Sequence, residues 1–212
     1  MNVATESQNE IQTEVPRAEG TALRLFIALR VPAVVQKRLT AVRSRLEEAR
    51  LPFRWVRPEG VHLTLVFLGS VAAARVDEIG REMAQAAAAA RPLRLEASGL
   101  GAFPSLSQPR VLWVGLIGDV DALAGLQRDL DRRMRRLGFE LDQRPFRPHV
   151  TLGRATGSLD ASSRLALQAE LKRPGQQFGR WRATSVELIE SKLSRGGSVY
   201  TTLLEAELGR PA

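Results

Sequence analysis

The chain has 212 residues, of which 44% are hydrophobic and 25% charged, a composition typical of a folded domain. It contains no cysteine, which excludes disulfides, thiolate nucleophiles, cysteine-based zinc sites and iron–sulfur clusters. A formal net charge of +8 favours anionic partners such as nucleic acid, nucleotides or an acidic membrane surface.

The first 20 residues, MNVATESQNEIQTEVPRAEG, are polar and lack both the basic and the apolar region of a secretory signal. We expect a disordered leader over residues 1–20 and one bilobal domain over residues 21–209. No apolar run approaches the roughly 20 residues that a membrane-spanning helix needs. We therefore expect a cytoplasmic protein without a membrane partner.

The first predicted elements are a buried strand and an amphipathic helix. The stretch LRLFIALRVP, residues 23–32, holds an apolar run that Pro32 ends, which is typical of a buried strand. Residues 33–50 repeat apolar side chains at spacings of four, three and four, so they predict a helix with one buried face, and Pro32 suits its first turn. The apolar positions are Val35, Leu39, Val42 and Leu46.

The next predicted elements run from residue 61 to residue 117. Residues 61–68 form a strand that Gly69 closes, and residues 72–92 form an alanine-rich helix that ends at Pro92. Strands are expected at 93–98 and 110–117. The stretch GLGAFPSLSQP between them is rich in Gly, Pro and Ser and predicts a loop.

The remaining elements complete an α+β pattern. Residues 119–140 predict a third helix, with Asp121 as a cap near its start and Gly138 as its C-terminal stop. A strand at 149–153, a helix at about 160–173 and a hairpin over 186–208 follow, and the glycines of residues 195–198 suit the hairpin turn. This order predicts two similar lobes, each giving one strand and one histidine to a shared cleft.

The chain has two histidines, and both lie in a His-aliphatic-Thr-Leu frame. Because side chains alternate across a strand, His62 and Thr64 point to one face, with Leu63, Leu65 and Phe67 on the other. His149 and Thr151 share a face in the same way. A single histidine in such a strand is most simply a satisfied interior residue. The recurrence of the whole frame around both histidines favours a functional pair instead.

Two imidazoles can divide acid–base chemistry between them, since histidine titrates near neutral pH. One would deprotonate an attacking water and the other would protonate the leaving oxygen of a phosphodiester. The hydroxyls of Thr64 and Thr151 can donate hydrogen bonds to the phosphate oxygens. The alternative for the histidines is a metal site, but they lack any local ligand spacing. We expect no metal and no cofactor.

The chain resembles the 2H phosphoesterase superfamily, which is defined by two His-x-Thr/Ser-x motifs. Within it, the chain is similar to the bacterial and archaeal RNA 2′,3′-cyclic phosphodiesterases, also called 2′-5′ RNA ligases. The resemblance rests on RLFIAL, HLTLVFLG, VLWVGL, RPHVTLGR and ELIESKLSRGGSVYTTL, and it spans about residues 23–205. It implies an α+β, bilobal fold in which antiparallel sheets face a central cleft.

The resemblance also implies a reaction and roles for four residues. The reaction is metal-independent hydrolysis of an RNA 2′,3′-cyclic phosphate end to a 2′-phosphate. His62 would be the acid that protonates the departing 3′ oxygen, and His149 the base that activates water. Thr64 and Thr151 would hold the phosphate. From the residues themselves, the assignment of acid and base stays open. The expected partner is RNA with a 2′,3′-cyclic phosphate end, bound by a monomer.

Three further residues are candidate substrate ligands. Arg154 matches an arginine that often ends the second motif in the family, but strand alternation places it opposite His149, so it needs a bend near Gly153 to reach the phosphate. Phe26 is either a core residue or a platform for the terminal base. Tyr200 either lines the groove or packs across the hairpin.

Other basic and aromatic residues admit simpler interpretations. The arginines of DRRMRR, at residues 131–136, form either an RNA-backbone patch or a solvated helix face, and the second interpretation is the simpler one. Trp55, Trp113 and Trp181 are scattered and are interpreted mainly as packing residues.

Three alternatives to RNA cyclic-phosphate hydrolysis remain. The first is a sibling phosphodiesterase that acts on small cyclic nucleotides or ADP-ribose cyclic phosphate. The second is a non-catalytic RNA-binding module, and the third is a structural protein that would leave the histidine pair unexplained. Weak ATP-independent 2′-5′ RNA ligation is a corollary of RNA cyclic-phosphate hydrolysis, because a 5′-hydroxyl can replace the attacking water. No phosphate-binding loop or nucleotidylation motif points to an ATP-driven ligase.

Overall fold

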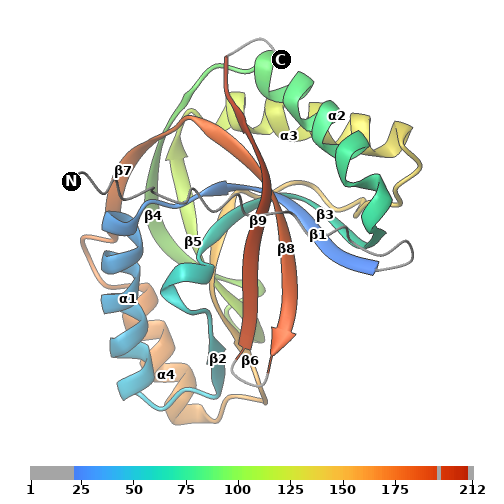
Figure 1. Cartoon of the computed structure of the whole chain (residues 1–212). Coiled ribbons are helices and arrows are strands. Elements are labelled where there is room, and N and C mark those ends of the chain that lie inside the picture. Colours follow the sequence, from blue (N-terminus) through green and yellow to red (C-terminus); the bar gives the residue numbers. More distant parts are fainter. Residues whose placement is uncertain (1–21, 195–196, 210–212) are drawn as a thin grey trace, which may run out of the picture.

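Two antiparallel sheets and four α-helices form the described part, residues 22–194 and 197–209, of the computed structural model (Figure 1). The predicted leader over residues 1–20 lies outside the described residues, as do Arg195 and Gly196 of the predicted hairpin turn. No helix in the described ranges is long and apolar enough to cross a membrane.

The first sheet has four strands and carries His62. Helices α2 (Val76–Ala88) and α3 (Val120–Arg136) pack together on its outer side, where α2 contacts β8 and β9 and α3 contacts β3 (Figure 1). The strands, in spatial order, are β3 (His62–Ala72), β1 (Ala22–Arg30), β8 (Ser185–Ser194) and β9 (Gly197–Glu207).

The second sheet has five strands and carries His149. Helices α1 (Ala33–Glu48) and α4 (Ala161–Leu171) belong to this side, where α1 contacts β7 and α4 contacts β4. The strands, in spatial order, are β2 (Phe53–Trp55), β6 (His149–Ala155), β5 (Pro109–Gly118), β4 (Leu93–Pro104) and β7 (Gln177–Ala183). Each sheet thus supplies one histidine strand, as the two motifs predict.

The two lobes are interleaved along the chain. Strand β1 belongs to the first sheet, whereas the helix that follows it, α1, packs on the second sheet. Strand β5 belongs to the second sheet, whereas α3, which follows it, packs on the first. One continuous core of buried side chains runs through both lobes. Because neither lobe is a continuous segment, the two sheets are held together by the chain crossing between them.

Most predicted helices and strands are present near their expected bounds. The four apolar positions of the first predicted helix are the buried residues of α1, and burying each stabilises the fold by about 1.5–3 kcal/mol. Gly138 follows α3 with a φ of 86°, a left-handed conformation that suits a helix stop. Asp121 is not the cap. The N-cap is Asp119, whose carboxylate binds Arg91 and the Arg94 amide instead of the helix.

The loop predicted over residues 99–109 is largely strand. Strand β4 continues to Pro104 and β5 begins at Pro109, because Gly99 takes up one extra residue with a φ of 73° and lets the pairing resume. Strands β2 and β7 were not predicted. Both are edge strands that pair with one neighbour, so much of their strand character comes from that neighbour.

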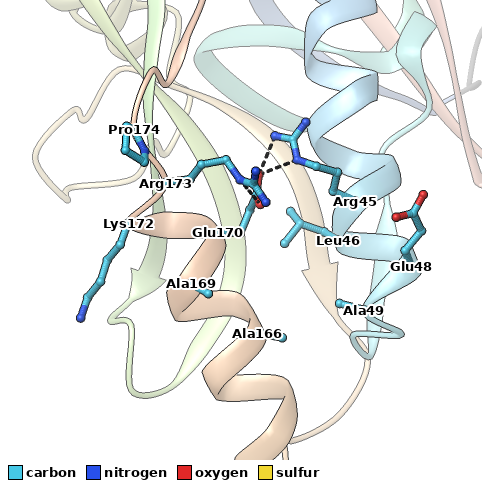
Figure 2. A pocket seen from close by; sticks show the side chains of 10 residues that line it. All are labelled: Arg45, Leu46, Glu48, Ala49, Ala166, Ala169, Glu170, Lys172, Arg173 and Pro174. Carbon is cyan, nitrogen blue, oxygen red and sulfur yellow. Dashed lines mark hydrogen bonds and ion pairs between the residues drawn. The ribbon is translucent and has the colours of Figure 1, made fainter.

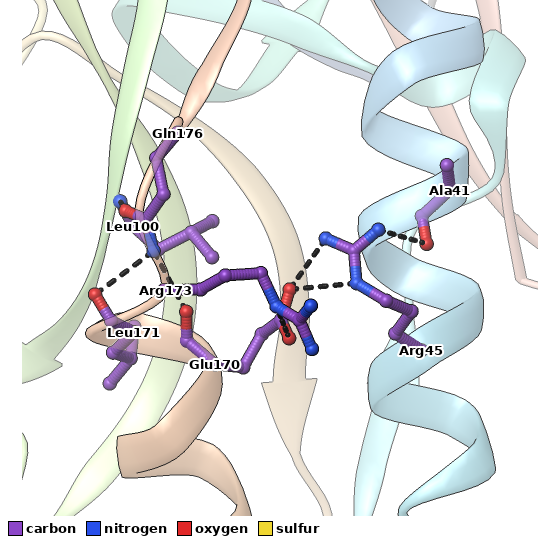
Figure 3. Close-up of polar contacts among 7 residues, drawn as sticks. All are labelled: Ala41, Arg45, Leu100, Glu170, Leu171, Arg173 and Gln176. Atoms are coloured by element: carbon purple, nitrogen blue, oxygen red, sulfur yellow. Dashed lines mark hydrogen bonds and ion pairs between the residues drawn. The ribbon is translucent and has the colours of Figure 1, made fainter.

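A pocket of about 450 Å³ lies between α1 and α4, away from both histidines (Figure 2). Its polar centre is the buried carboxylate of Glu170. Arg45 on α1 donates to one of its oxygens at 2.5 and 2.9 Å, and Arg173 donates to the other at 2.8 Å (Figure 3). The Gln176 amide donates to the carbonyls of Glu170 and Leu171. The Arg45–Glu170 ion pair links α1 to α4, and the Arg173 and Gln176 contacts hold the end of α4.

The basic stretch at the end of α3 is engaged in ion pairs. Arg133 donates to Glu82 of α2 at 2.7 Å, and the other three arginines also have acidic partners on α2 or α3. These pairs are Arg132 with Asp129, Arg135 with Asp131 and Arg136 with Glu82. This favours the interpretation of a solvated helix face over that of an RNA-backbone patch.

Candidate active site

His62 is the first residue of β3 and follows the short 3₁₀ turn η1 (Pro58–Gly60). Its imidazole donates a hydrogen bond to the Gly60 carbonyl. Gly60 has no room for a side chain, because a Cβ there would lie 2.8 Å from Cε2 of Tyr200. The turn, the tyrosine and the histidine therefore form one packed unit.

His149 is the first residue of β6 and has the same local setting. Its Nδ1 lies 2.7 Å from the Arg147 carbonyl oxygen. In both motifs, the imidazole thus binds the carbonyl of the residue two positions earlier. For His149, an Nδ1–H donated to this carbonyl leaves Nε2 free to exchange a proton with a bound ligand.

The strand register places His62 and Thr64 on one face of the first sheet. They lie opposite Arg30 and Ala28 of β1. Phe67 was expected on the other face, and this is wrong: Phe67 pairs with Phe26, on the same side as Ala28. The reason is a bulge at Leu65, which has no partner in β1 and so shifts the alternation by one residue.

A second bulge brings Arg154 to the face of His149 and Thr151. In the pairing of β6 with β5, His149, Thr151 and Arg154 lie opposite Gly115, Trp113 and Val111, which alternate regularly on one side. Leu152 has no partner. The strand therefore has its irregularity next to Gly153, where a bend is needed for Arg154 to reach the face of His149. Gly153 has no side chain, which leaves room for the Trp55 ring.

The two histidine strands approach each other where the sheets meet, since β3 contacts β6 directly. The charges of the two motifs act on one another there. The guanidinium of Arg154 lowers the pKa of both imidazoles, and His149 lowers the pKa of His62. His62, His149 and Arg154 therefore belong to one site.

Burial has the largest effect on both histidines. It is the main cause that lowers the pKa of His62 to about 4, and it also lowers the pKa of His149. The backbone carbonyls of Gly60 and Arg147 act in the opposite direction. Both imidazoles are consequently neutral near pH 7, the form in which a histidine accepts a proton. A bound anion would favour the protonated form of either.

Aromatic rings enclose the two imidazoles. The His62 ring lies 4.5 Å from Phe26 and 5.1 Å from Tyr200, measured between centroids. The His149 ring lies 5.0 Å from Phe103, edge to face, and 6.4 Å from Trp113. These rings displace water from the imidazoles, which accounts for the desolvation.

Six of the seven predicted site residues thus lie around the two imidazoles. The seventh, Phe26, lies beneath His62. Phe26 is only 3% exposed and packs with Ala28, Ile189 and Tyr200, so its surroundings favour a packing role below His62. Tyr200 is partly exposed beside it. The other five are His62, His149, Thr64, Thr151 and Arg154.

Sequence reasoning missed two neighbours of His149. Phe103 fell in the predicted loop, and Trp113 was interpreted as a packing residue. Trp113 lies two residues before Gly115, which pairs with His149. Side-chain alternation along β5 therefore places Trp113 on the face of His149, and this alternation is the signal that could have identified it. In the described ranges, no three His, Asp or Glu side chains gather as a metal-binding group. The donors present, imidazoles, hydroxyls and a guanidinium, suit an anion.

Comparison with known proteins gives a consistent result. The sequence matches the family described as LigT-like phosphoesterase over residues 29–113 and 117–200. It is 33% identical over 170 residues to an RNA 2′,3′-cyclic phosphodiesterase of Aeropyrum pernix, a match that covers 80% of this chain and 94% of that protein. A protein of the same name from Aquifex aeolicus is 30% identical over 178 residues, covering 82% and 93%.

Solved structures show the same architecture. A protein of Thermus thermophilus superposes with a TM-score of 0.74 at 26% identity, over 89% of this chain and 99% of that one. The Escherichia coli LigT structure solved with 3′-AMP superposes with a TM-score of 0.72, at the same identity and coverage.

Proposed function

The chain belongs to the LigT-like phosphoesterase family, and on that premise we propose that it hydrolyses RNA 2′,3′-cyclic phosphate ends to 2′-phosphates with its two histidines as acid and base. The observation that carries the proposal is the convergence of both His-Thr pairs and Arg154 on one site. The names of the relatives supply the substrate class.

The proposed reaction is an in-line displacement at phosphorus. Neutral His149 takes a proton from water, whose oxygen forms a bond to phosphorus while the bond to the 3′ oxygen breaks. His62, in the protonated form that the bound phosphate anion favours, gives its proton to the 3′ oxygen, which leaves a 3′-hydroxyl and a 2′-phosphate. One imidazole gains the proton that the other loses, and exchange with solvent restores both.

The remaining residues would stabilise the charge that develops on phosphate. The hydroxyls of Thr64 and Thr151 face the site from the two sheets, and the Arg154 guanidinium can donate two hydrogen bonds to the non-bridging oxygens. Tyr200 would line the groove. Exchanging water for a 5′-hydroxyl would give 2′-5′ ligation by the same groups.

The proposal is tested with an oligoribonucleotide that ends in a 2′,3′-cyclic phosphate, in the presence of EDTA. We expect turnover by the wild type and a loss of about a hundredfold or more in His62→Ala and in His149→Ala, since each removes one proton-transfer group. Circular dichroism and thermal unfolding check that both variants remain folded.

Three outcomes would contradict parts of the proposal. Binding of the oligonucleotide without turnover would favour the non-catalytic RNA-binding module. Turnover that EDTA abolishes would contradict a metal-independent reaction. Faster turnover of a small cyclic nucleotide than of any oligonucleotide would replace RNA as the substrate class.

A further inference from the structure

Three arginines gather on two neighbouring strands of the second sheet, and the reaction proposed above does not use them. In the pairing of β4 with β7, Arg94 lies directly opposite Arg182, and Glu96 lies directly opposite Arg180. The pairing is regular over this stretch, so the four side chains lie on the same face of the sheet. We call Arg94, Arg180 and Arg182 the arginine cluster.

The arginine cluster carries more positive charge than its surroundings neutralise. Arg180 donates a hydrogen bond to the carboxylate of Glu96 at 2.6 Å, and Glu96 is 7% exposed. In the described ranges, no carboxylate lies within ion-pair distance of the Arg94 or the Arg182 guanidinium. Three guanidiniums thus surround one carboxylate, which leaves a net charge of +2.

The opposed pair of Arg94 and Arg182 is unfavourable in the free protein. Both are exposed, and like charges directly opposite each other in neighbouring strands destabilise a sheet. The nearby carboxylate of Asp119 does not relieve this, because it accepts from the Arg91 guanidinium and the Arg94 backbone amide. A ligand that carries phosphate groups would remove the repulsion, and arginine suits phosphate through its fork of donors.

The arginine cluster lies on the face of the second sheet that carries His149. Ser98 follows Glu96 by two residues in β4 and pairs with Gly115 of β5. Gly115 in turn pairs with His149. Since side chains alternate along a strand, Glu96 and the arginines beside it share the face of His149. The cluster and the candidate active site are therefore parts of one surface.

This surface is open to solvent between the arginine cluster and the active site. Ile117 of β5, which pairs with Glu96, is 47% exposed, and the side chain of Arg180 is 82% exposed. Helix α1 covers the other face of the sheet, where a Cβ at Gly179 would lie 3.2 Å from Cγ2 of Val35. A nucleic acid strand can therefore lie along the open face without displacing a helix.

The distance between the arginine cluster and His149 exceeds the length of one nucleotide. Strand β7 is three strands away from β6, and Arg180 and Arg182 are displaced by two and four residues along the strands. With strands about 4.8 Å apart and about 3.4 Å per residue, the Cα atoms are roughly 16–20 Å from that of His149. Because phosphates of one helical strand follow at about 3.4 Å, the cluster meets phosphates within about five nucleotides of the end.

We propose that the arginine cluster binds backbone phosphates of the RNA strand that leads to the cyclic phosphate end. An oligoribonucleotide is then held more tightly than a mononucleotide, without preference for sequence, because phosphates carry no sequence information. This inference rests on the proposed function, since it specifies how the substrate of that reaction is held. The cluster takes no part in making or breaking bonds.

The test variant is Arg94→Gln combined with Arg182→Gln. It leaves the Arg180–Glu96 ion pair intact, because removing Arg180 would leave a buried carboxylate without its partner. For a decaribonucleotide with a 2′,3′-cyclic phosphate end, we expect KM to rise about three- to tenfold at about 100 mM salt, with kcat unchanged. KM for a nucleoside 2′,3′-cyclic phosphate should stay the same. The salt dependence of kcat/KM for the decaribonucleotide should weaken by about one to two units of slope.

The matched control is Arg128→Gln combined with Arg164→Gln, which removes the same charge from exposed positions on α3 and α4. We expect wild-type KM values for both substrates. Arg94→Lys combined with Arg182→Lys keeps the charge and should retain most of the affinity. Thermal unfolding checks the fold, and the Arg94 and Arg182 glutamine variant should be at least as stable as the wild type, since it removes a repulsion.

Three kinetic results would overturn the inference. They are an unchanged decaribonucleotide KM in the Arg94 and Arg182 glutamine variant, an equal rise in KM for the nucleoside cyclic phosphate, and an equal effect in the Arg128 and Arg164 control.

A binding measurement separates this inference from the proposed function. Fluorescence anisotropy of a labelled decaribonucleotide that ends in a 2′-phosphate gives Kd without turnover. If the wild type turns over no cyclic phosphate, the proposed function fails. Weaker binding by the Arg94 and Arg182 glutamine variant than by the wild type and the control would still support the arginine cluster as an RNA contact, and equal binding by all three would overturn it.

Discussion

His62 and His149 occupy the same backbone setting but different electrostatic surroundings. Each ring binds the carbonyl two residues earlier, and each is partly enclosed by aromatic rings. Arg154 acts on both, whereas the carboxylate of Glu187 acts on His62. At the scale of the residue, sequence repetition thus explains the geometry that the histidines share, and burial together with the surrounding charges sets how far the pKa of each is lowered.

Arg154 provides a residue-scale prediction. Replacing it by Ala removes a positive charge that lowers the pKa of both imidazoles, so both pKa values should rise in an NMR titration. The loss of charged hydrogen bonds to phosphate should reduce kcat/KM about tenfold to a hundredfold. Arg154→Lys should retain part of the activity, since it keeps the charge but loses the fork-shaped donor.

The control for charge alone is Arg164→Ala, an exposed arginine on α4. It changes the net charge by the same amount at a distance from the histidines. Equal losses in Arg154→Ala and Arg164→Ala would show that the effect is one of overall charge and not of contact with the phosphate.

At the scale of the element, bulges position the site. Leu65 in β3 has no register partner in β1, and Leu152 in β6 has none in β5. Each bulge changes which side chains share the face of the histidine in that strand. The first moves Phe67 to the face of His62, and the second moves Arg154 to the face of His149. Glycines support the second sheet at close approaches, where Gly153 meets Trp55 and Gly101 meets Trp113.

Gly101 provides the element-scale prediction. A Cβ at this position would lie 2.3 Å from two atoms of the Trp113 ring, and that ring contacts His149. Gly101→Ala should therefore displace Trp113, lower the free energy of unfolding by about 1–3 kcal/mol and lower kcat by disturbing His149. Chemical denaturation and the same turnover assay measure these two effects.

The comparison is Gly157→Ala, in the bend after β6, where a Cβ would meet nothing within 4 Å. This variant should behave like the wild type. If Gly101→Ala were as stable and as active as Gly157→Ala, the Trp113 ring would not position His149.

At the scale of the whole molecule, two sheets from interleaved segments meet at their histidine strands, and the chain carries a net charge of +8. The arginines at the end of α3 are ion-paired, so the proposed attraction to a polyanion would come from basic residues elsewhere. The lobes share one core and are connected by chain crossings, which keeps the two histidine strands next to each other.

The net charge predicts a difference between long and short substrates. Raising monovalent salt from about 50 mM to about 300 mM should raise KM for a cyclic-phosphate oligoribonucleotide several-fold, because backbone contacts release counterions. KM for a nucleoside 2′,3′-cyclic phosphate should change little. An equal salt dependence for both substrates would show that the RNA backbone is not bound and would favour the small-nucleotide alternative.

The sequence by itself determined the elements with strong local patterns and the pairing of the two motifs. The helical spacing of α1, the stop at Gly138 and the alternation of His62 with Thr64 depend on neighbours within a few residues, so they are visible in the chain itself. The edge strands β2 and β7 and the continuation of β4 past Gly99 depend on partner strands far along the chain, so local pattern did not predict them.

Only the tertiary structure decided how the site is assembled. A bulge is defined against the strand it pairs with, so the side of the sheet taken by Arg154 and Phe67 follows from β5 and β1 and not from their own segments. One of the charges that act on His62 is placed in the same way. Glu187 follows His62 by more than half the chain, and its charge reaches that ring because β8 pairs with β1 beside β3.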